Sequence, residues 1–109
     1  MKEAKGNPRE KVVAPRKDIV ASMASDFKKV LGDAIAEKID KLVIDLDGVE
    51  TVDSAGIGVI VSAYNSMKKA GGSISITNVN PDTYKLFKAM RLDEHFDIGS
   101  INQSNPFAV

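Results

Sequence analysis

The apolar positions of this chain follow two kinds of pattern, and the shorter kind predicts strands. Residues 41–46 form a nearly continuous run of branched apolar side chains, which indicates a strand covered on both faces. Residues 73–77 alternate polar and apolar positions, as a strand with one covered face does. Runs at 12–13 and 96–98 predict two further short strands. Pro15 ends the first of them, because proline lacks the amide hydrogen of a central strand.

The longer pattern repeats at three and four residues and predicts three helices. The first spans 22–39, with Ser22 as its N-cap, and the second spans 55–70. The third starts at Asn80-Pro81-Asp82, a cap followed by proline in the first helical position, and continues to Arg91. We expect it to bury a stripe made of Tyr84, Leu86, Phe87 and Met90.

These elements alternate in the order β-α-β-α-β-α-β, which defines the fold class. Alternation of this kind predicts an α/β fold with right-handed crossovers. We expect one domain, in which a small, mixed and mostly parallel sheet has helices packed against it. Residues 11–99 form that domain, residues 1–10 a flexible N-terminal leader and residues 100–109 a loose C-terminal tail.

Composition narrows the function. The 109 residues allow one domain, carry no net charge, contain one histidine and lack cysteine, which excludes disulfides and thiolate metal sites. Residues 1–17 hold six Lys or Arg against two Glu, but these charges are scattered without aromatic residues. We interpret this stretch as a solvated leader and expect no nucleic-acid binding. With neither a membrane-spanning run nor a signal peptide, we expect a cytoplasmic protein without membrane insertion.

Ser54 is the residue of most interest. The stretch from Asp45 to Gly58 leads from a strand through an Asp47-Gly48 turn into the start of a helix. A helix N-terminus has free N–H groups and a partial positive charge, so it accommodates an anion. Residue types alone leave two interpretations open: Ser54 caps the helix, or its hydroxyl accepts a phosphoryl group.

Three other candidate sites are weaker. Gly56-Ile57-Gly58 lacks the third glycine of a dinucleotide fingerprint and the Lys-Ser/Thr of a P-loop, so nucleotide binding remains only an alternative. The carboxylates near residue 50 could suggest a Mg²⁺ site, but strand alternation points Asp45 away from its neighbours, and we expect no metal or other cofactor. His95 could suggest a proton relay with Asp93 and Asp97, although no nucleophile accompanies it.

The stretch from Leu42 to Ile98 resembles the STAS domain family, of sulfate transporters and anti-sigma factor antagonists. Leu42-Val43-Ile44-Asp45-Leu46 followed by Val52-Asp53-Ser54-Ala55-Gly56-Ile57-Gly58 is similar to the family's strand and Asp-Ser-small-Gly-Leu-Gly element. The resemblance covers residues 11–99 and implies a STAS-like fold in the anti-sigma factor antagonist branch.

That branch implies a regulatory binding module and not an enzyme. Its serine after the aspartate, here Ser54, is phosphorylated by a partner kinase that is also the anti-sigma factor, and a phosphatase reverses the step. The implied partner surface comprises Asp53, Ser54, Ala55, Gly56, Ile57 and Gly58. The resemblance also allows a STAS adaptor that does not switch, in a sensor complex or a lipid-transport system, and a weak homodimer.

The sequence departs from the family before the first helix. Family members carry a Gly-[Glu/Asp]-Leu-Asp turn there, whereas this chain reads Lys17-Asp18-Ile19-Val20. Because that turn lies near the family's partner-binding face, the departure bears on which partner is recognised.

Overall fold

The computed structural model describes residues 9–100, so most of the predicted leader 1–10 and tail 100–109 lies outside the described residues. The elements follow the predicted alternation. Their bounds are β1 (Glu10–Val13), α1 (Ala21–Ala36), β2 (Lys41–Asp45), α2 (Ser54–Lys69), β3 (Ser73–Val79), α3 (Pro81–Ala89), the 3₁₀ turn η1 (Leu92–Glu94) and β4 (Asp97–Ser100).

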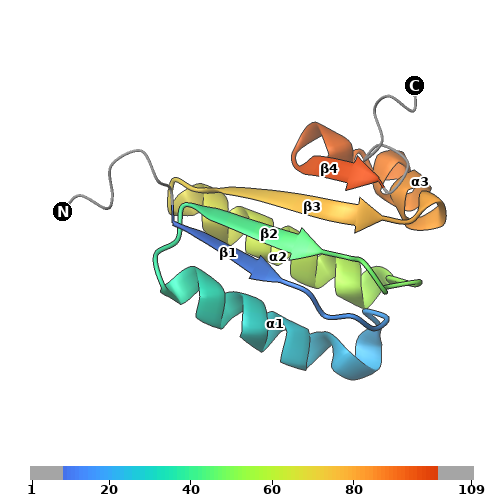
Figure 1. The fold of residues 1–109 in the computed structure, drawn as a ribbon, viewed down its shortest axis with the longest axis horizontal. Coiled ribbons are helices and arrows are strands. Elements are labelled where there is room, and N and C mark those ends of the chain that lie inside the picture. The colour runs from blue at the N-terminus through green and yellow to red at the C-terminus, as the bar shows by residue number, and fades with distance from the viewer. Residues whose placement is uncertain (1–8, 101–109) are drawn as a thin grey trace.

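The four strands form one sheet in the order β1-β2-β3-β4, and each neighbouring pair is parallel (Figure 1). The sequence had predicted a mixed, mostly parallel sheet, and the described strands make it parallel throughout. Because the strands run the same way, their carboxyl ends meet at one edge of the sheet. The loops that lead into α1, α2 and α3 therefore gather at that edge (Figure 1).

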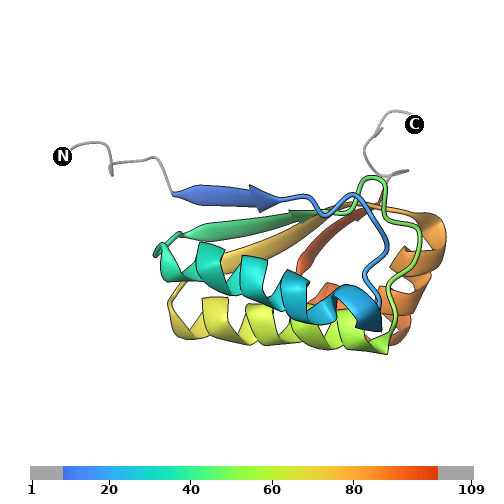
Figure 2. The ribbon, with the colours of Figure 1, turned by 90° about the horizontal axis from the view of Figure 1, so that it is seen from below.

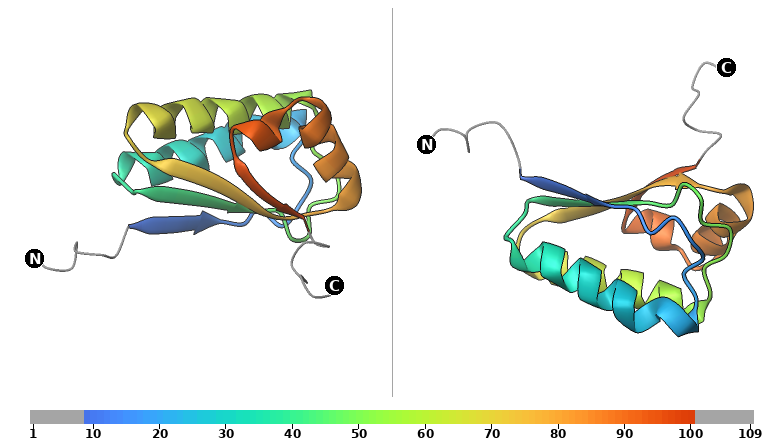
Figure 3. Two further views of the ribbon diagram at one scale, coloured as in Figure 1. Left: turned by 90° about the horizontal axis from the view of Figure 1, so that it is seen from above. Right: turned by 60° about the horizontal axis from the view of Figure 1, so that its bottom comes forward.

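The helices lie on one side of this sheet (Figures 2 and 3). Strands in sequential order, joined by crossovers of one hand, place every crossover helix on the same face. The burial of β2 agrees, because Leu42 and Ile44 are buried while Lys41, Val43 and Asp45 are only half-buried. The prediction that this strand is covered on both faces was therefore wrong.

A single hydrophobic core fills the space between the sheet and the helices. Ile19, Leu42, Ile60 and Phe87 have no exposed surface within it. On α2, Ile57, Ile60 and Met67 are buried, and Val61 and Tyr64 pack against the core.

The buried stripe predicted for α3 was wrong in part. Phe87 is buried, but 38% of Leu86 and 48% of Met90 is exposed. Only one side of this nine-residue helix meets the core, and Thr83 and Phe87, four positions apart, occupy it. α1 also ends at Ala36, three residues before its predicted end.

Candidate functional site

Ser54 is the first residue of α2, and its side chain is exposed. The chain reaches it from the carboxyl end of β2 through a loop whose Val49 and Val52 are buried. Thus the predicted passage from strand through turn to helix is confirmed. The hydroxyl of Ser54 lies at a helix N-terminus and is open to solvent.

Asp53, the residue before it, is the N-cap of α2. The Gly56 N–H donates to Asp53 Oδ1 at 3.0 Å, and the Ala21 N–H donates to Asp53 Oδ2 at 3.0 Å. Ala21 is the first residue of α1, whose own N-cap, Val20, has no side-chain acceptor. A single carboxylate therefore caps two helices, one with each oxygen.

This arrangement corrects the predicted cap of the first helix. Ser22 is the second residue of α1 rather than its N-cap. The helix begins without a local cap because Asp53 supplies the acceptor from 32 positions further along the chain. A sequence pattern within one segment cannot show a contact of this kind.

The hydrogen bonds that Asp53 accepts from the two helix starts also lower its pKa. The N–H of Gly56 contributes most to lowering the pKa of Asp53 below the ordinary aspartate value, the N–H of Ala21 adds to it, and desolvation opposes both. A carboxylate that accepts backbone N–H bonds is stabilised in its charged form. Asp53 is accordingly ionised at neutral pH, one residue from the Ser54 hydroxyl.

The backbone beside Ser54 is held against the turn before α1. Ile19 N–H donates to Thr51 O at 2.9 Å, and Asp53 N–H donates to Ile19 O at 3.1 Å. Gly56 packs tightly on this pair, since a Cβ at Gly56 would lie 2.5 Å from Ile19 O and 3.0 Å from Val52 Cγ1. Only glycine lets α2 approach so closely.

Asp18 is a residue that the sequence reasoning missed. Its Oδ1 accepts hydrogen bonds from Glu50 N–H at 2.9 Å and from Thr51 N–H at 3.1 Å. The 17–20 stretch, which departs from the family turn, is thus fastened to the loop that leads to Ser54. Its sequence signal was its place in the 17–20 stretch, where it matches the acidic position of the family's Gly-[Glu/Asp]-Leu-Asp turn.

A second polar cluster lies where β2 and β3 end. Asp45 Oδ1 accepts from Asn78 Nδ2 at 2.9 Å and from Asp47 N–H at 3.0 Å, and Arg16 lies 3.5 Å from Asp45 Oδ2. Burial raises the pKa of Asp45, but these partners outweigh it and leave the pKa below the ordinary value. The partners of Asp45 are thus an amide, a backbone N–H and a guanidinium, on the face of β2 opposite to the buried Ile44.

The acidic residues near position 50 and His95 were the other candidate sites. Within residues 9–100, no group of three or more His, Asp and Glu side chains could hold a metal ion. His95 is exposed and packs on Tyr64, with ring centroids 5.8 Å apart.

Among residues 9–100, no helix is both long and apolar enough to cross a membrane.

The chain is similar to known proteins of one family. The model of the STAS domain family matches residues 1–104. The chain belongs to the STAS domain family. Both the resemblance and the STAS-like fold expected from the sequence are thereby confirmed.

The relatives of this STAS protein include anti-sigma factor antagonists. The anti-sigma-B factor antagonist of Bacillus subtilis (strain 168) is 35% identical over 66 residues, which is 61% of this chain and 61% of that protein. The match therefore spans less than two thirds of that relative's length. The chain is anti-sigma factor antagonist-like, and its named relatives are bacterial.

Solved structures show the same STAS fold. TM1081 of Thermotoga maritima superposes with a TM-score of 0.79 at 26% identity, over 87% of this chain and 83% of that one. The phosphorylated form of the Bacillus cell fate determinant SpoIIAA superposes with a TM-score of 0.68 at 12% identity, over 96% of each chain. At that identity the second likeness concerns the fold alone.

Residues 53–58, which match the Asp-Ser-small-Gly-Leu-Gly element of the STAS family, differ in how far they are exposed to solvent. Ser54 and Gly58 are exposed, Asp53 and Ala55 are half-buried, and Gly56 and Ile57 are buried. This division follows the turn of the helix, because positions 54 and 58 share a face while 56 and 57 point into the core.

Proposed function

We propose that this protein is an anti-sigma factor antagonist whose binding is switched by phosphorylation of Ser54. Unphosphorylated protein binds an anti-sigma factor that is also a serine kinase. That kinase phosphorylates Ser54 and is released, and a phosphatase restores the binding form. The chain itself catalyses neither step.

One observation carries this proposal: an exposed serine hydroxyl at the first position of α2, in a STAS protein related to anti-sigma factor antagonists. A kinase needs access to the hydroxyl, and Ser54 is accessible. Asp53 already accepts the Gly56 N–H, so the Ser54 side chain is not needed as the helix cap. These features favour a modification site over the capping role that residue types had left open.

The electrostatics of the site support a switch. A phosphoryl group adds a charge of about −1.5 to −2 at neutral pH. At Ser54 that charge would lie at the start of α2, close to the start of α1, where both helix dipoles favour it. It would also lie beside the ionised Asp53 and face any bound partner. The fold can therefore tolerate a charge that a partner packed on Ser54 cannot.

The surface that we propose contacts the anti-sigma factor is the exposed part of residues 53–58. Ser54 and Gly58 offer it directly, and Asp53 and Ala55 offer part of their surface. Gly56 and Ile57, buried in the core, contribute by holding these residues in place.

The first test is chemical. The purified protein is incubated with ATP and each serine-kinase anti-sigma factor of its host, and phosphate is located by mass spectrometry. We expect phosphate on Ser54 and none in the Ser54→Ala variant. The proposal would be contradicted by phosphate on another serine, or if none of these kinases phosphorylated the protein.

The second test measures binding to the same kinases by calorimetry. We expect Ser54→Asp to bind much more weakly than wild type. Ser73→Asp is the matched control, because Ser73 is exposed at the first residue of β3, at the opposite end of the sheet. A non-switching adaptor would instead bind equally well with aspartate at position 54.

A further inference from the structure

β1 forms one outer edge of the sheet, and within residues 9–100 no strand pairs with that edge (Figure 1). Arg9 O accepts the Lys41 N–H at 3.0 Å, so the odd-numbered residues of β1 direct their backbone groups toward β2. Because a strand alternates with a period of two, the N–H and C=O groups of Glu10, Val12 and Ala14 point outward. A free edge of this kind is a template for pairing with another strand.

The middle of this edge is apolar. Val12 is 54% exposed, and residues 12–15 carry no charge. Edge strands that remain single are commonly protected by a charged side chain or a proline in the edge. Pro15 gives no such protection, because by the same alternation its missing N–H lies on the side of β2. It also favours the extended conformation at Ala14, the residue before it, and so prolongs the edge.

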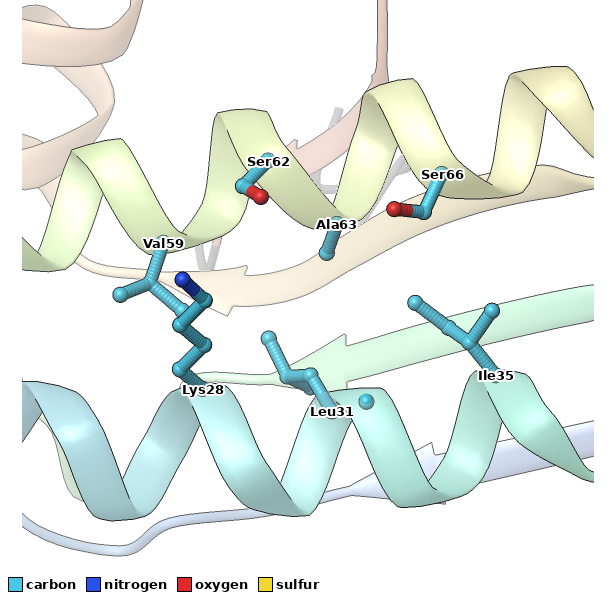
Figure 4. A pocket seen from close by; sticks show the side chains of 8 residues that line it. Lys28, Leu31, Ile35, Val59, Ser62, Ala63 and Ser66 are labelled. Atoms are coloured by element: carbon cyan, nitrogen blue, oxygen red, sulfur yellow. The ribbon is translucent and has the colours of Figure 1, made fainter.

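α1 has a groove on each of its sides. On the side of α2, the groove holds about 120 Å³, and both helices line it, with Leu31 on α1 and Val59 on α2 (Figure 4). On the side of β1, the groove holds about 430 Å³ and has a mainly apolar lining that includes Met23 and the 48% exposed Val30. Only β1, the loop after it and α1 line this second groove. Its outer side therefore lies open beside the free edge of β1.

The sequence of β1 selects one register for pairing with the β1 of a second copy. In an antiparallel pair, a twofold axis perpendicular to the sheet keeps the helices of both copies on one side, and one residue lies at the axis. With Glu10 or Lys11 at the axis, like charges would face each other, which is destabilising. With a residue beyond Val12 at the axis, fewer residues would pair, because Arg16 has a φ of 61° and ends the extended chain.

With Val12 at the axis, the two edges are complementary. Val12 of each copy faces Val12 of the other, and Glu10 faces Ala14. These residues direct their backbone groups outward, so each facing pair can exchange both of its N–H···O bonds. No like charges face each other in this register. On the helix side, Lys11 already pairs with Glu37 of its own chain at 3.4 Å.

We propose that two copies of this chain pair along the outer edges of β1, antiparallel and with the Val12 side chains side by side at a twofold axis. The pairing joins two four-stranded sheets into one, and the second copy's strand covers the open side of the groove between β1 and α1. A ladder over residues 10–14 is only about 17 Å long at about 3.4 Å per residue. We therefore expect a dissociation constant of roughly 10–100 µM, typical of a small interface. The dimer does not depend on phosphorylation of Ser54.

The test follows the mass of the full chain by sedimentation velocity from about 1 µM to about 1 mM. Wild type should shift from monomer to dimer over this range. Val12→Lys and Val12→Glu should each weaken dimerisation by more than about tenfold, because each sets like charges against each other at the axis. An equimolar mixture of the two variants should dimerise at least about tenfold more tightly than either alone, since opposite charges then meet.

Met90→Lys is the matched control, because Met90 is 48% exposed at the end of α3. It should change the dissociation constant by less than about threefold. Unfolding midpoints near that of wild type exclude misfolding as the cause of a lost dimer.

Three results would overturn the proposal. The first is a wild-type protein that stays monomeric over the whole range, whether the edge of β1 is then free, covered by residues 1–8 or taken by a strand of another protein. The second is a dimer that the Val12 variants leave unchanged or that Met90→Lys weakens equally, since such a dimer uses another surface. The third is a mixture of Val12→Lys and Val12→Glu that dimerises no better than either variant, since Val12 would then not face Val12.

Discussion

Replacing Gly56 by alanine should destabilise this protein, although alanine is the better helix former. A Cβ at position 56 would lie 2.5 Å from Ile19 O and 2.8 Å from Ile19 Cγ2. The first of these atoms belongs to the backbone and cannot rotate away. Relief therefore requires that α2 move away from the turn before α1, and that movement stretches the bond from Asp53 N–H to Ile19 O, now 3.1 Å.

The magnitude follows from these contacts. Overpacking a buried position costs about 1–3 kcal/mol, and a weakened hydrogen bond adds about 1 kcal/mol. The helix propensity of alanine offsets at most about 1 kcal/mol, and less in the first turn of a helix. We expect Gly56→Ala to lower the free energy of unfolding by about 2–3 kcal/mol, which lowers the melting temperature by roughly 10–20 °C in a domain of this size.

Gly58 provides the matched control on the same helix. It is exposed, and a Cβ there would meet nothing within 4 Å. Gly58→Ala should therefore gain up to about 1 kcal/mol from helix propensity. Urea denaturation followed by circular dichroism compares the two variants. A Gly56→Ala protein as stable as Gly58→Ala would refute the close packing of α2 on Ile19.

Three further predictions concern the rest of the fold. Phe87→Ala should lower the free energy of unfolding by about 3–5 kcal/mol in urea titrations, because Phe87 is completely buried. Asn80 caps α3 with its Oδ1 and donates from Nδ2 to two carbonyls of the loop before Ser54. Asn80→Asp keeps the cap but turns an acceptor-only carboxylate oxygen toward those carbonyls, so it should be no more stable than Asn80→Ala, which costs roughly 1–3 kcal/mol. The pKa of Asp45 in the folded protein lies below the unfolded value of 3.8. Ionised Asp45 therefore contributes its full stabilisation of the fold at pH values above 3.8, and this contribution is lost as the pH falls below that value. Urea titrations from pH 6 to pH 2.5 should show this loss in wild type and a smaller one in Asp45→Asn.

Much of the fold could be predicted because its signals are local. A run of branched residues, a repeat at three and four positions, or Asn80-Pro81 before a helix acts within a few neighbours in the chain. For the same reason the position of Ser54 was predictable, as a strand, a turn and a helix start follow one another directly.

What the sequence could not show depends on contacts between distant segments. Asp53 caps α1 across 32 positions, and Asp18 holds the loop before Ser54 across a similar distance. The exposure of one face of β2 depended on strand order, which fixes the side that the crossover helices occupy. Leu86 and Met90 have the same helical spacing as buried residues. They are exposed because only a narrow side of α3 meets the core.

The dual role of Asp53 explains why an aspartate suits the position before the serine. Two helix starts each present an N–H group, and a carboxylate offers one oxygen to each. Asparagine has a single acceptor oxygen and would turn an N–H₂ group toward the other donor, while serine could not span both. Because Asp53 satisfies both helices, the hydroxyl of Ser54 has no structural bond to maintain. A phosphoryl group on Ser54 would thus break no contact that holds the fold, and its main effect would fall on whatever binds the exposed start of α2.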